Sequence, residues 1–322
     1  MKPILFIHIP KTAGTSFRKA YAGKVRPGKA FCDYDKNSPE TSQLVREWII
    51  ERDDYWGFKQ EFDRAGGEFL TGHFPASRYV HLFGVENTVT FLREPLQRVM
   101  SEYEHFVRLN GFTGTFQDFF ASPHFINRQS KRLKGVPVPA LRFIGLTERY
   151  QESLDIFEEC LDIKVPCLEL NFGKNGKGTV YDFTEAEQRE LKKLNQDDIT
   201  LYENVSHWFD IVLNCIQKGQ PLVRGQIDRV HQSQVEGWAV SDNPGIVNIE
   251  ILRNDQPCGV CRAKNFKKDL RALGISRGGY VGFQMAIPEL QSGDRVQARS
   301  ADTGQPLYGA DFIASKAHIK SH

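Results

Sequence analysis

An apolar run that ends in a polar, glycine-containing loop opens the 322-residue chain: Ile4-Leu5-Phe6-Ile7-His8-Ile9-Pro10-Lys11-Thr12-Ala13-Gly14-Thr15-Ser16. The pattern predicts a buried strand, a tight loop and a helix over about 15–21. Free backbone N–H groups and the positive end of a helix attract anions at such a loop, and Lys11 adds a full charge. The segment therefore predicts a site for phosphate or a group like it.

This loop differs from a nucleotide-binding Walker loop. In the Walker pattern G-x-x-x-x-G-K-[ST], the lysine follows the second glycine. Here Lys11 precedes Gly14, and no glycine lies four or five residues before the lysine.

Two further segments repeat the order of strand, break and polar side chain. Residues 87–103 predict a strand that ends at Arg93 and a helix that begins at Pro95, where the missing N–H of proline costs nothing. Residues 69–75 predict a short strand ended by Gly72, with His73 just past it. In open α/β sheets, ligands bind outside the carboxyl ends of strands. We therefore expect Lys11, His73 and Arg93 to converge.

The order Pro10-Lys11-Thr12-Ala13-Gly14-Thr15-Ser16, followed by Arg93-Glu94-Pro95 with Arg98, Ser101 and Tyr103, resembles a family of sulfotransferases. These enzymes use 3′-phosphoadenosine-5′-phosphosulfate (PAPS) as donor. The similarity is to the group acting on carbohydrates, such as heparan sulfate 2-O- and 6-O-sulfotransferases. It implies a P-loop-like three-layer α/β/α fold with a parallel sheet, and PAP as the product nucleotide.

The resemblance also implies roles for individual residues. The donor's phosphosulfate end would be held by Lys11, Thr12, Ala13, Gly14, Thr15 and Ser16. Arg93 and Ser101 would contact its 3′-phosphate, while Arg98 braces the helix and Tyr103 packs.

These residues suit in-line transfer of a sulfuryl group to a hydroxyl. A preorganised cation stabilises the charge that builds on the leaving oxygen, which is the role expected of Lys11. Histidine titrates near neutrality and can take a proton from an alcohol, so His73 is the expected base. We expect His8 to be a core histidine and His81 and His105 to be structural. The chemistry needs no metal, and the sequence offers no obvious metal cluster.

Two segments are candidates for further contacts. A basic run follows Asn127 and includes Arg132; it is either a solvated helix face or a rim that meets an anionic ligand. The resemblance implies that Asn127 and Gln129 lie near the cleft, so we expect acceptor contacts from Asn127, Gln129 and Arg132. The loop at 172–178 either closes over the donor through Lys174 and Lys177 or is a plain surface loop.

The character of the chain changes after Pro221. Short alternating strands broken by glycine and polar turns predict a β-sandwich at 222–322, following a catalytic domain at 1–220. Pieces such as Val235–Ala239 resemble a small β domain appended to bacterial glycan-modifying enzymes. It would bind glycan, dock a partner protein or only stabilise the enzyme. Trp238 is either a core residue or a sugar platform.

Composition bounds the remaining possibilities. A formal net charge of +2 gives no bulk attraction to nucleic acid. The six cysteines are scattered, and the lone C-x-x-C at 258–261 has no second pair, so they do not predict a zinc site. The strand predicted there also places Cys258 and Cys261 on opposite faces. We find no signal peptide or membrane span in the sequence, which predicts a bacterial-type cytoplasmic enzyme.

Two other classes of function stay open. A nucleotide-dependent kinase would use the first loop for ATP, but it requires a Mg²⁺-holding acidic residue at a strand end, and no such residue stands in a Walker-like context. A non-catalytic protein that binds glycan or nucleotide would tolerate loss of His73.

Overall fold

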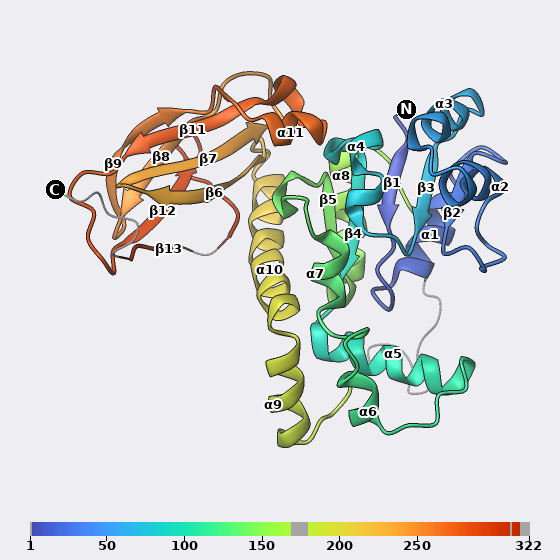
Figure 1. Cartoon of the computed structure of the whole chain (residues 1–322). Helices are drawn as coiled ribbons and strands as arrows, with labels where there is room; N and C mark the ends of the chain where they lie inside the picture. Colours follow the sequence, from blue (N-terminus) through green and yellow to red (C-terminus); the bar gives the residue numbers. More distant parts are fainter. Residues whose placement is uncertain (1, 169–179, 310, 316–322) are drawn as a thin grey trace. The chain divides into compact units, whose positions relative to one another are not determined.

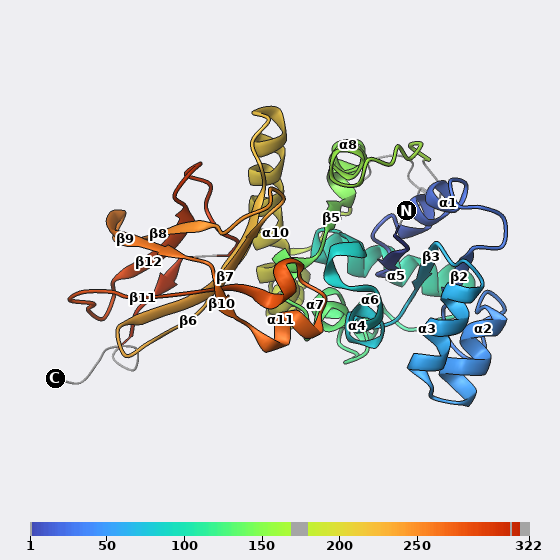
Figure 2. The same ribbon diagram turned by 90° about the horizontal axis from the view of Figure 1, so that it is seen from above.

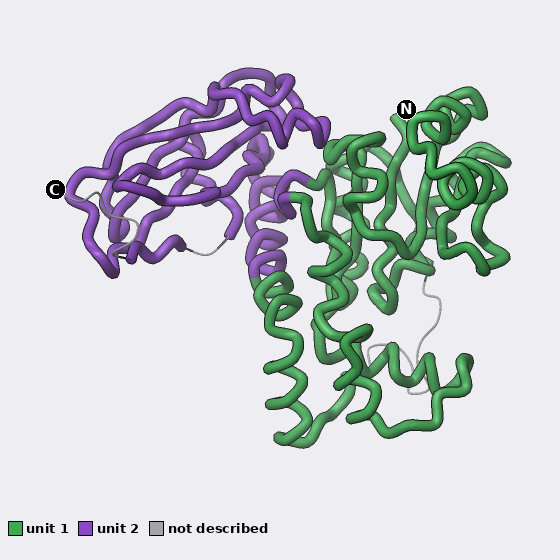
Figure 3. The backbone as a smooth tube through the Cα atoms, viewed as in Figure 1, with its two compact units in different colours: residues 1–136, 141–203 green, residues 137–140, 204–322 purple. Residues whose placement is uncertain are grey.

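The computed structural model describes residues 2–168, 180–309 and 311–315. The chain forms two compact units: unit 1 comprises residues 1–136 and 141–203, and unit 2 comprises residues 137–140 and 204–322 (Figure 3). The division falls inside helix α10 (Gln196–Gln217), whereas the sequence-predicted domains 1–220 and 222–322 meet just after that helix. In the described part of the chain, no helix is both long and apolar enough to cross a membrane.

Unit 1 contains a five-stranded parallel sheet, as the alternation of strands and helices in the sequence predicts (Figures 1 and 2). Its order is β2–β3–β1–β4–β5, so the three strands that carry the predicted site residues are neighbours. The strand bounds are β1 Ile4–Ile7, β2 Ala30–Asp33, β3 Phe69–Gly72, β4 Thr88–Leu92 and β5 Phe143–Leu146.

Aromatic side chains attach helices to both faces of this sheet. Phe17 of α1 (Gly14–Ala22) contacts Phe6 and Phe91 of the sheet and Phe157 of α8 (Tyr150–Leu161). On the other face, Phe62 of α3 (Tyr55–Arg64) contacts Phe31 of β2 and Phe83 of α4 (Val80–Phe83). Burying one such ring stabilises the fold by about 1.5–3 kcal/mol, so these contacts fix the sheet and its helices as one body. The other longer helices of unit 1 are α5 (Pro95–Leu109), α6 (Phe116–Phe120), α7 (Arg128–Leu133) and α9 (Glu185–Leu194).

Unit 2 contains two four-stranded antiparallel sheets, ordered β10–β11–β7–β6 and β13–β12–β8–β9. Val235 and Ala239 of the first sheet and Ile249, Ile251 and Val296 of the second share one buried core. Trp238 is 1% exposed and therefore belongs to the interior rather than to a sugar platform. The strand bounds are β6 Val223–His231, β7 Gln234–Ser241, β8 Asn248–Arg253, β9 Gln256–Arg262, β10 Asn265–Phe266, β11 Tyr280–Ala286, β12 Arg295–Ser300 and β13 Phe312–Ile313.

One expectation for unit 2 is wrong. Cys258 and Cys261 were expected on opposite faces of their strand, but both pack against the same core. The register of β9 against β8 shifts between Ile251 and Leu252, which inserts one extra residue into β9. Because a bulge of this kind offsets the two-residue alternation of a strand, residues three apart come to the same side.

Candidate functional site

The loop after β1 has an unusual backbone. Lys11 and Ala13 adopt left-handed conformations with φ of 69° and 61°, which is uncommon for residues other than glycine. The buried Thr12 stabilises the loop, because its hydroxyl donates to the carbonyl oxygen of Ile9 at 2.9 Å. A Cβ atom at Gly14 would lie 2.0 Å from the His8 ring, so the loop passes this buried ring only with glycine at position 14.

This backbone leaves a row of hydrogen-bond donors at the start of α1. The amides of Ser16 and Phe17 donate to the carbonyl oxygen of Ala13. Among the described residues, the amides from Thr12 to Thr15 have no acceptor. Successive free amides beside a helix N-terminus fit an anion such as a phosphate.

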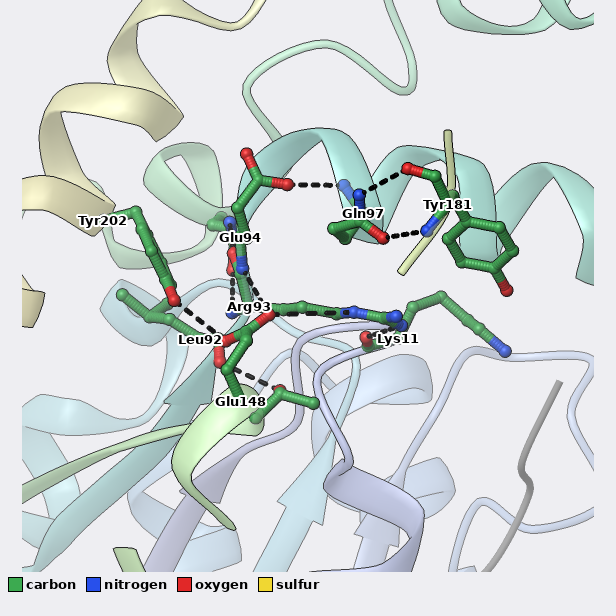
Figure 4. Close-up of polar contacts among 10 residues, drawn as sticks. Lys11, Leu92, Arg93, Glu94, Gln97, Glu148, Tyr181 and Tyr202 are labelled. Carbon is green, nitrogen blue, oxygen red and sulfur yellow. Dashed lines mark hydrogen bonds and ion pairs between the residues drawn. The ribbon is translucent and has the colours of Figure 1, made fainter. Parts of the chain in front are cut away.

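Lys11 and Arg93 meet at this loop, as the sequence predicts. The Arg93 guanidinium donates to the carbonyl oxygen of Lys11 at 3.4 Å, and Figure 4 shows the two side chains next to each other. The Lys11 ammonium has no carboxylate partner among the described residues. Burial, and then the charges of Arg93 and Arg108, lower its pKa, because a cation is less stable when desolvated among other cations. The pair therefore forms a positively charged corner suited to an anion.

Gln129 holds Arg93 in place. Its side-chain amide is fully buried; it accepts from the Arg93 amide at 3.0 Å and donates to the Arg93 carbonyl oxygen at 2.9 Å. The Arg93 side chain then lies 4.0 Å from a carboxylate oxygen of Glu148 (Figure 4). The sequence predicts Gln129 as an acceptor contact, whereas its carboxamide is already bonded to the backbone of Arg93.

Tyr181 is a site residue that sequence reasoning missed. Its backbone is tied to Gln97 of α5 by two hydrogen bonds of 2.7 and 3.0 Å (Figure 4). Its hydroxyl donates to Glu104 at 2.7 Å. The ring centre lies 5.9 Å from the Arg93 guanidinium carbon, and the hydroxyl also meets Ser101, two turns along α5. Tyr181 thus lies beside both residues predicted to hold a 3′-phosphate. No local pattern around position 181 signals this.

His73 lies at the end of β3, next to strand β1. Its amide donates to the carbonyl oxygen of Asp33 at 3.0 Å, and its ring contacts those of His8 and Tyr34 at 4.6 and 4.7 Å. The His73 Nε2 atom is buried and has no hydrogen-bond partner among the described residues. Burial, and then the charges of Arg132, Arg128 and Arg18, lower the pKa of His73 to about 3. The ring is therefore neutral at pH 7 and has a free nitrogen.

The other histidines have distinct environments. The prediction that His8 is a core histidine is confirmed: it is 5% exposed, and its Nδ1 lies 2.9 Å from the Tyr34 hydroxyl. His81 is exposed. The pKa of His105 is lowered first by burial and second by the positive charge of Lys11.

The basic run of α7 divides into paired and unpaired cations. Arg128 lies 2.7 Å from Glu102, which also pairs with the buried Arg98 at 2.6 Å, so Arg98 braces the helix as predicted. Arg132 has no carboxylate partner in the described ranges. Burial, and then Arg128, lower the pKa of Arg132 to about 10. An unpaired, largely desolvated guanidinium near His73 is suited to an incoming anion.

Asn127 is engaged at the start of α10. Its side-chain Nδ2 donates to the Asp197 carboxylate at 3.0 Å, and its side-chain Oδ1 accepts from the backbone amide of Asp198 at 3.2 Å. Lys174 and Lys177 lie outside the described residues. No group of three or more His, Cys, Asp or Glu side chains in the described ranges could hold a metal ion.

Comparison of the chain with protein-family models, with curated proteins and with solved structures gives no match.

Proposed function

We propose that the protein is a PAPS-dependent sulfotransferase that transfers a sulfuryl group to a hydroxyl of a carbohydrate. In this proposal the loop after β1 acts as a P-loop-like phosphosulfate site in unit 1. The observation that carries the proposal is the contact of Arg93 with Lys11 after the adjacent strands β4 and β1, together with the neutral ring of His73 after the next strand, β3.

In the proposed reaction, the acceptor oxygen forms a bond to sulfur while the bond from sulfur to the bridging phosphate oxygen breaks. The electron pair of the broken bond stays on that oxygen, and PAP leaves. The Lys11 ammonium and the free amides from Thr12 to Thr15 stabilise this developing charge. His73 Nε2 accepts the proton of the acceptor hydroxyl, which requires the neutral ring that burial favours.

The acceptor residues separate into two roles. Arg132 has a guanidinium free to contact the acceptor, near His73. The side chains of Asn127 and Gln129 already bond within unit 1, so we propose that these two position the site.

The cysteines support a cytoplasmic setting. In the described part of the chain none of the six forms a disulfide, and Cys167 is exposed. Cysteines stay reduced in reducing compartments, so we propose that the reaction takes place in the cytoplasm.

The proposal is tested by thermal unfolding with PAP, 5′-AMP or Mg-ATP added. At 100 times its Kd, a ligand stabilises the folded state by about 2.7 kcal/mol. We expect PAP to stabilise the wild type and not Arg93→Ala, while Arg64→Ala, which removes an exposed arginine, responds like the wild type. Stabilisation by Mg-ATP equal to that by PAP would overturn the proposal in favour of a kinase.

Turnover then separates an enzyme from a binding protein. With PAPS and a panel of polysaccharides, Lys11→Ala and His73→Ala should abolish sulfate transfer, and Arg93→Ala should mainly weaken donor affinity. If His73→Ala transfers sulfate at the wild-type rate, the proposed mechanism is wrong.

A further inference from the structure

A second charged surface lies in unit 2, far along the sequence from the site in unit 1. We call it the basic-aromatic patch and define it by Phe266, Lys267, Arg271, Arg277 and Tyr280. These residues come from β10, from α11 (Lys268–Ala272), from the turn Ser276–Gly279 and from the start of β11. Figures 1 and 2 show α11 next to these strands.

Two exposed rings form the centre of the patch. Phe266 and Tyr280 face each other across the pair β10–β11, with ring centres 5.2 Å apart. They are 45% and 55% exposed. The Arg271 guanidinium carbon lies 5.9 Å from the Phe266 ring centre, so a cation borders the aromatic pair.

The backbone holds these side chains in a fixed arrangement. The Lys267 amide donates to the Gly279 carbonyl oxygen at 2.8 Å, and the Arg277 Nε donates to the Tyr280 carbonyl oxygen at 3.3 Å. Gly279 has a φ of 85°, and a Cβ there would lie 2.8 Å from that of Arg271. The patch is thus a built surface rather than a chance grouping of loop residues.

Charge is concentrated in this part of the chain. Residues 262–280 contain six lysines and arginines and one aspartate, a net charge of +5. Because the whole chain carries +2, all other residues together carry −3. Of the six cations, Lys267 pairs with Asp228 at 2.8 Å, and the rest have no carboxylate partner among the described residues. The fold leaves these charges available to an anionic partner.

We propose that the basic-aromatic patch binds an anionic, sulfate-bearing polysaccharide. This identification of the partner rests on the proposed function, whose product carries sulfate esters. The exposed rings offer apolar faces to the C–H faces of sugar rings, and the flanking cations pair with sulfate groups. The patch would retain the modified glycan on the enzyme.

The test measures binding of dextran sulfate and of uncharged dextran to the full-length protein without PAPS. Each cation that pairs with a polyanion releases condensed counterions, so affinity falls as salt rises. We expect dextran sulfate to bind and dextran not to. Replacing Arg271 and Arg277, two cations of the patch, together by glutamine should weaken binding by about tenfold at low salt and reduce its salt dependence. The matched control replaces Lys218 and Arg229, elsewhere in unit 2, by glutamine and should leave binding unchanged.

A second pair of variants tests the aromatic rings without changing charge. Phe266→Ala should weaken binding, and Phe266→Tyr, which keeps the ring, should restore it. Thermal unfolding of each variant checks that the sheet is intact. If both the charge variant and Phe266→Ala bind like the wild type, the inference is overturned. Equal or tighter binding of single-stranded DNA through the same residues would also overturn it.

Failure of this inference and failure of the proposed function give different results. Lys11→Ala combined with Arg132→Gln removes two cations of the site in unit 1 and should keep binding at the patch. If instead this double variant alone abolishes binding, the polysaccharide binds in unit 1, and the patch has no such role. If patch binding persists but no PAP binding is found, the proposed function fails and the inference that the patch binds a sulfated glycan stands.

Discussion

Gly14 and His8 are packed so closely that the loop after β1 keeps its position only if residue 14 has no side chain. A Cβ at this position would lie 2.0 Å from His8 Cδ2 and 2.4 Å from Nε2. His8 has little room to move, because its ring is buried against His73 and bonded to Tyr34.

Gly14→Ala should therefore lower the free energy of unfolding by about 1–3 kcal/mol, the usual cost of overpacking. It should also weaken PAP binding, because the displaced loop carries the free amides. The matched control is Gly23→Ala at the other end of α1, where an added Cβ meets nothing closer than 3.4 Å. Denaturant unfolding measures both variants; equal stability of the two would show that the loop adapts.

His73 makes the stability of the protein depend on pH. Its pKa is about 3 in the folded state, and about 6.5 is usual for an unfolded chain. Between these values the unfolded state binds one more proton, so folding is favoured by higher pH. The contribution is complete above about pH 6.5 and is lost as the pH falls toward 3.

We expect the free energy of unfolding to fall by about 1.4 kcal/mol per pH unit for this proton below pH 6, with a further contribution from His8, whose pKa burial also lowers. Urea unfolding at several pH values measures the slope. His73→Gln should reduce it, and His81→Gln, at an exposed position, should not. A wild-type slope that His73→Gln leaves unchanged would contradict the assignment. Because His73 stays neutral down to low pH in the enzyme without substrate, kcat/KM should not fall near pH 6.5 through protonation of His73.

At the scale of elements, α7 positions the end of β4 through one side chain. Gln129 satisfies both backbone groups of Arg93. Gln129→Leu keeps a side chain of similar size but leaves the two backbone groups of Arg93 without a partner. The loss costs about 1–3 kcal/mol for each buried group. The exposed Gln151, which donates to Asp155 at 2.9 Å, is the matched control for the same substitution.

The kinetic result separates two roles for Gln129. If it positions Arg93, Gln129→Leu should raise the Kd for PAP and lower the free energy of unfolding. If it contacts the acceptor, as the sequence predicts, the variant should raise only the KM for the carbohydrate. Calorimetric titration with PAP and steady-state kinetics distinguish these outcomes.

The elements that form the site differ in how far the sequence predicts them. The strands β1, β3 and β4 are predicted from largely apolar runs that break at Pro10, at Gly72 and after Arg93. The observed strands lie within these runs, at Ile4–Ile7, Phe69–Gly72 and Thr88–Leu92. The pattern Thr184-Glu-Ala-Glu187 is typical of a capping box, and the structure forms one there at the start of α9. These features are local, so a single sequence contains their signal.

Residues that reach the site through tertiary packing give no such signal. The four residues of β2 lack a clear periodicity, so the position of Tyr34 just after this strand was not predicted. Tyr181 reaches α5 through bonds to Gln97, 84 positions earlier. Helical spacing of residues 265–273 favours a helix from Asn265, but Asn265 and Phe266 pair with β11, so α11 begins only at Lys268.

At the scale of the whole molecule, the chain has two separate cores. Phe17 is fully buried in the aromatic core of unit 1, and Ile251 is fully buried in the core of unit 2. The proposed donor site lies entirely in unit 1, whereas the basic-aromatic patch lies in unit 2. We therefore expect PAP binding to stabilise unit 1 alone, and a substitution in the core of one unit to destabilise that unit alone.

Differential scanning calorimetry tests this separation. Ile251→Ala removes buried apolar atoms and should destabilise unit 2 by about 2–5 kcal/mol. We expect two unfolding transitions, of which Ile251→Ala lowers one and PAP raises the other. Phe17→Ala should lower the transition that PAP raises, because α1 carries both Phe17 and the donor loop. A single transition that responds to all three changes would show that α10, which continues from one unit into the other, couples them into one cooperative structure.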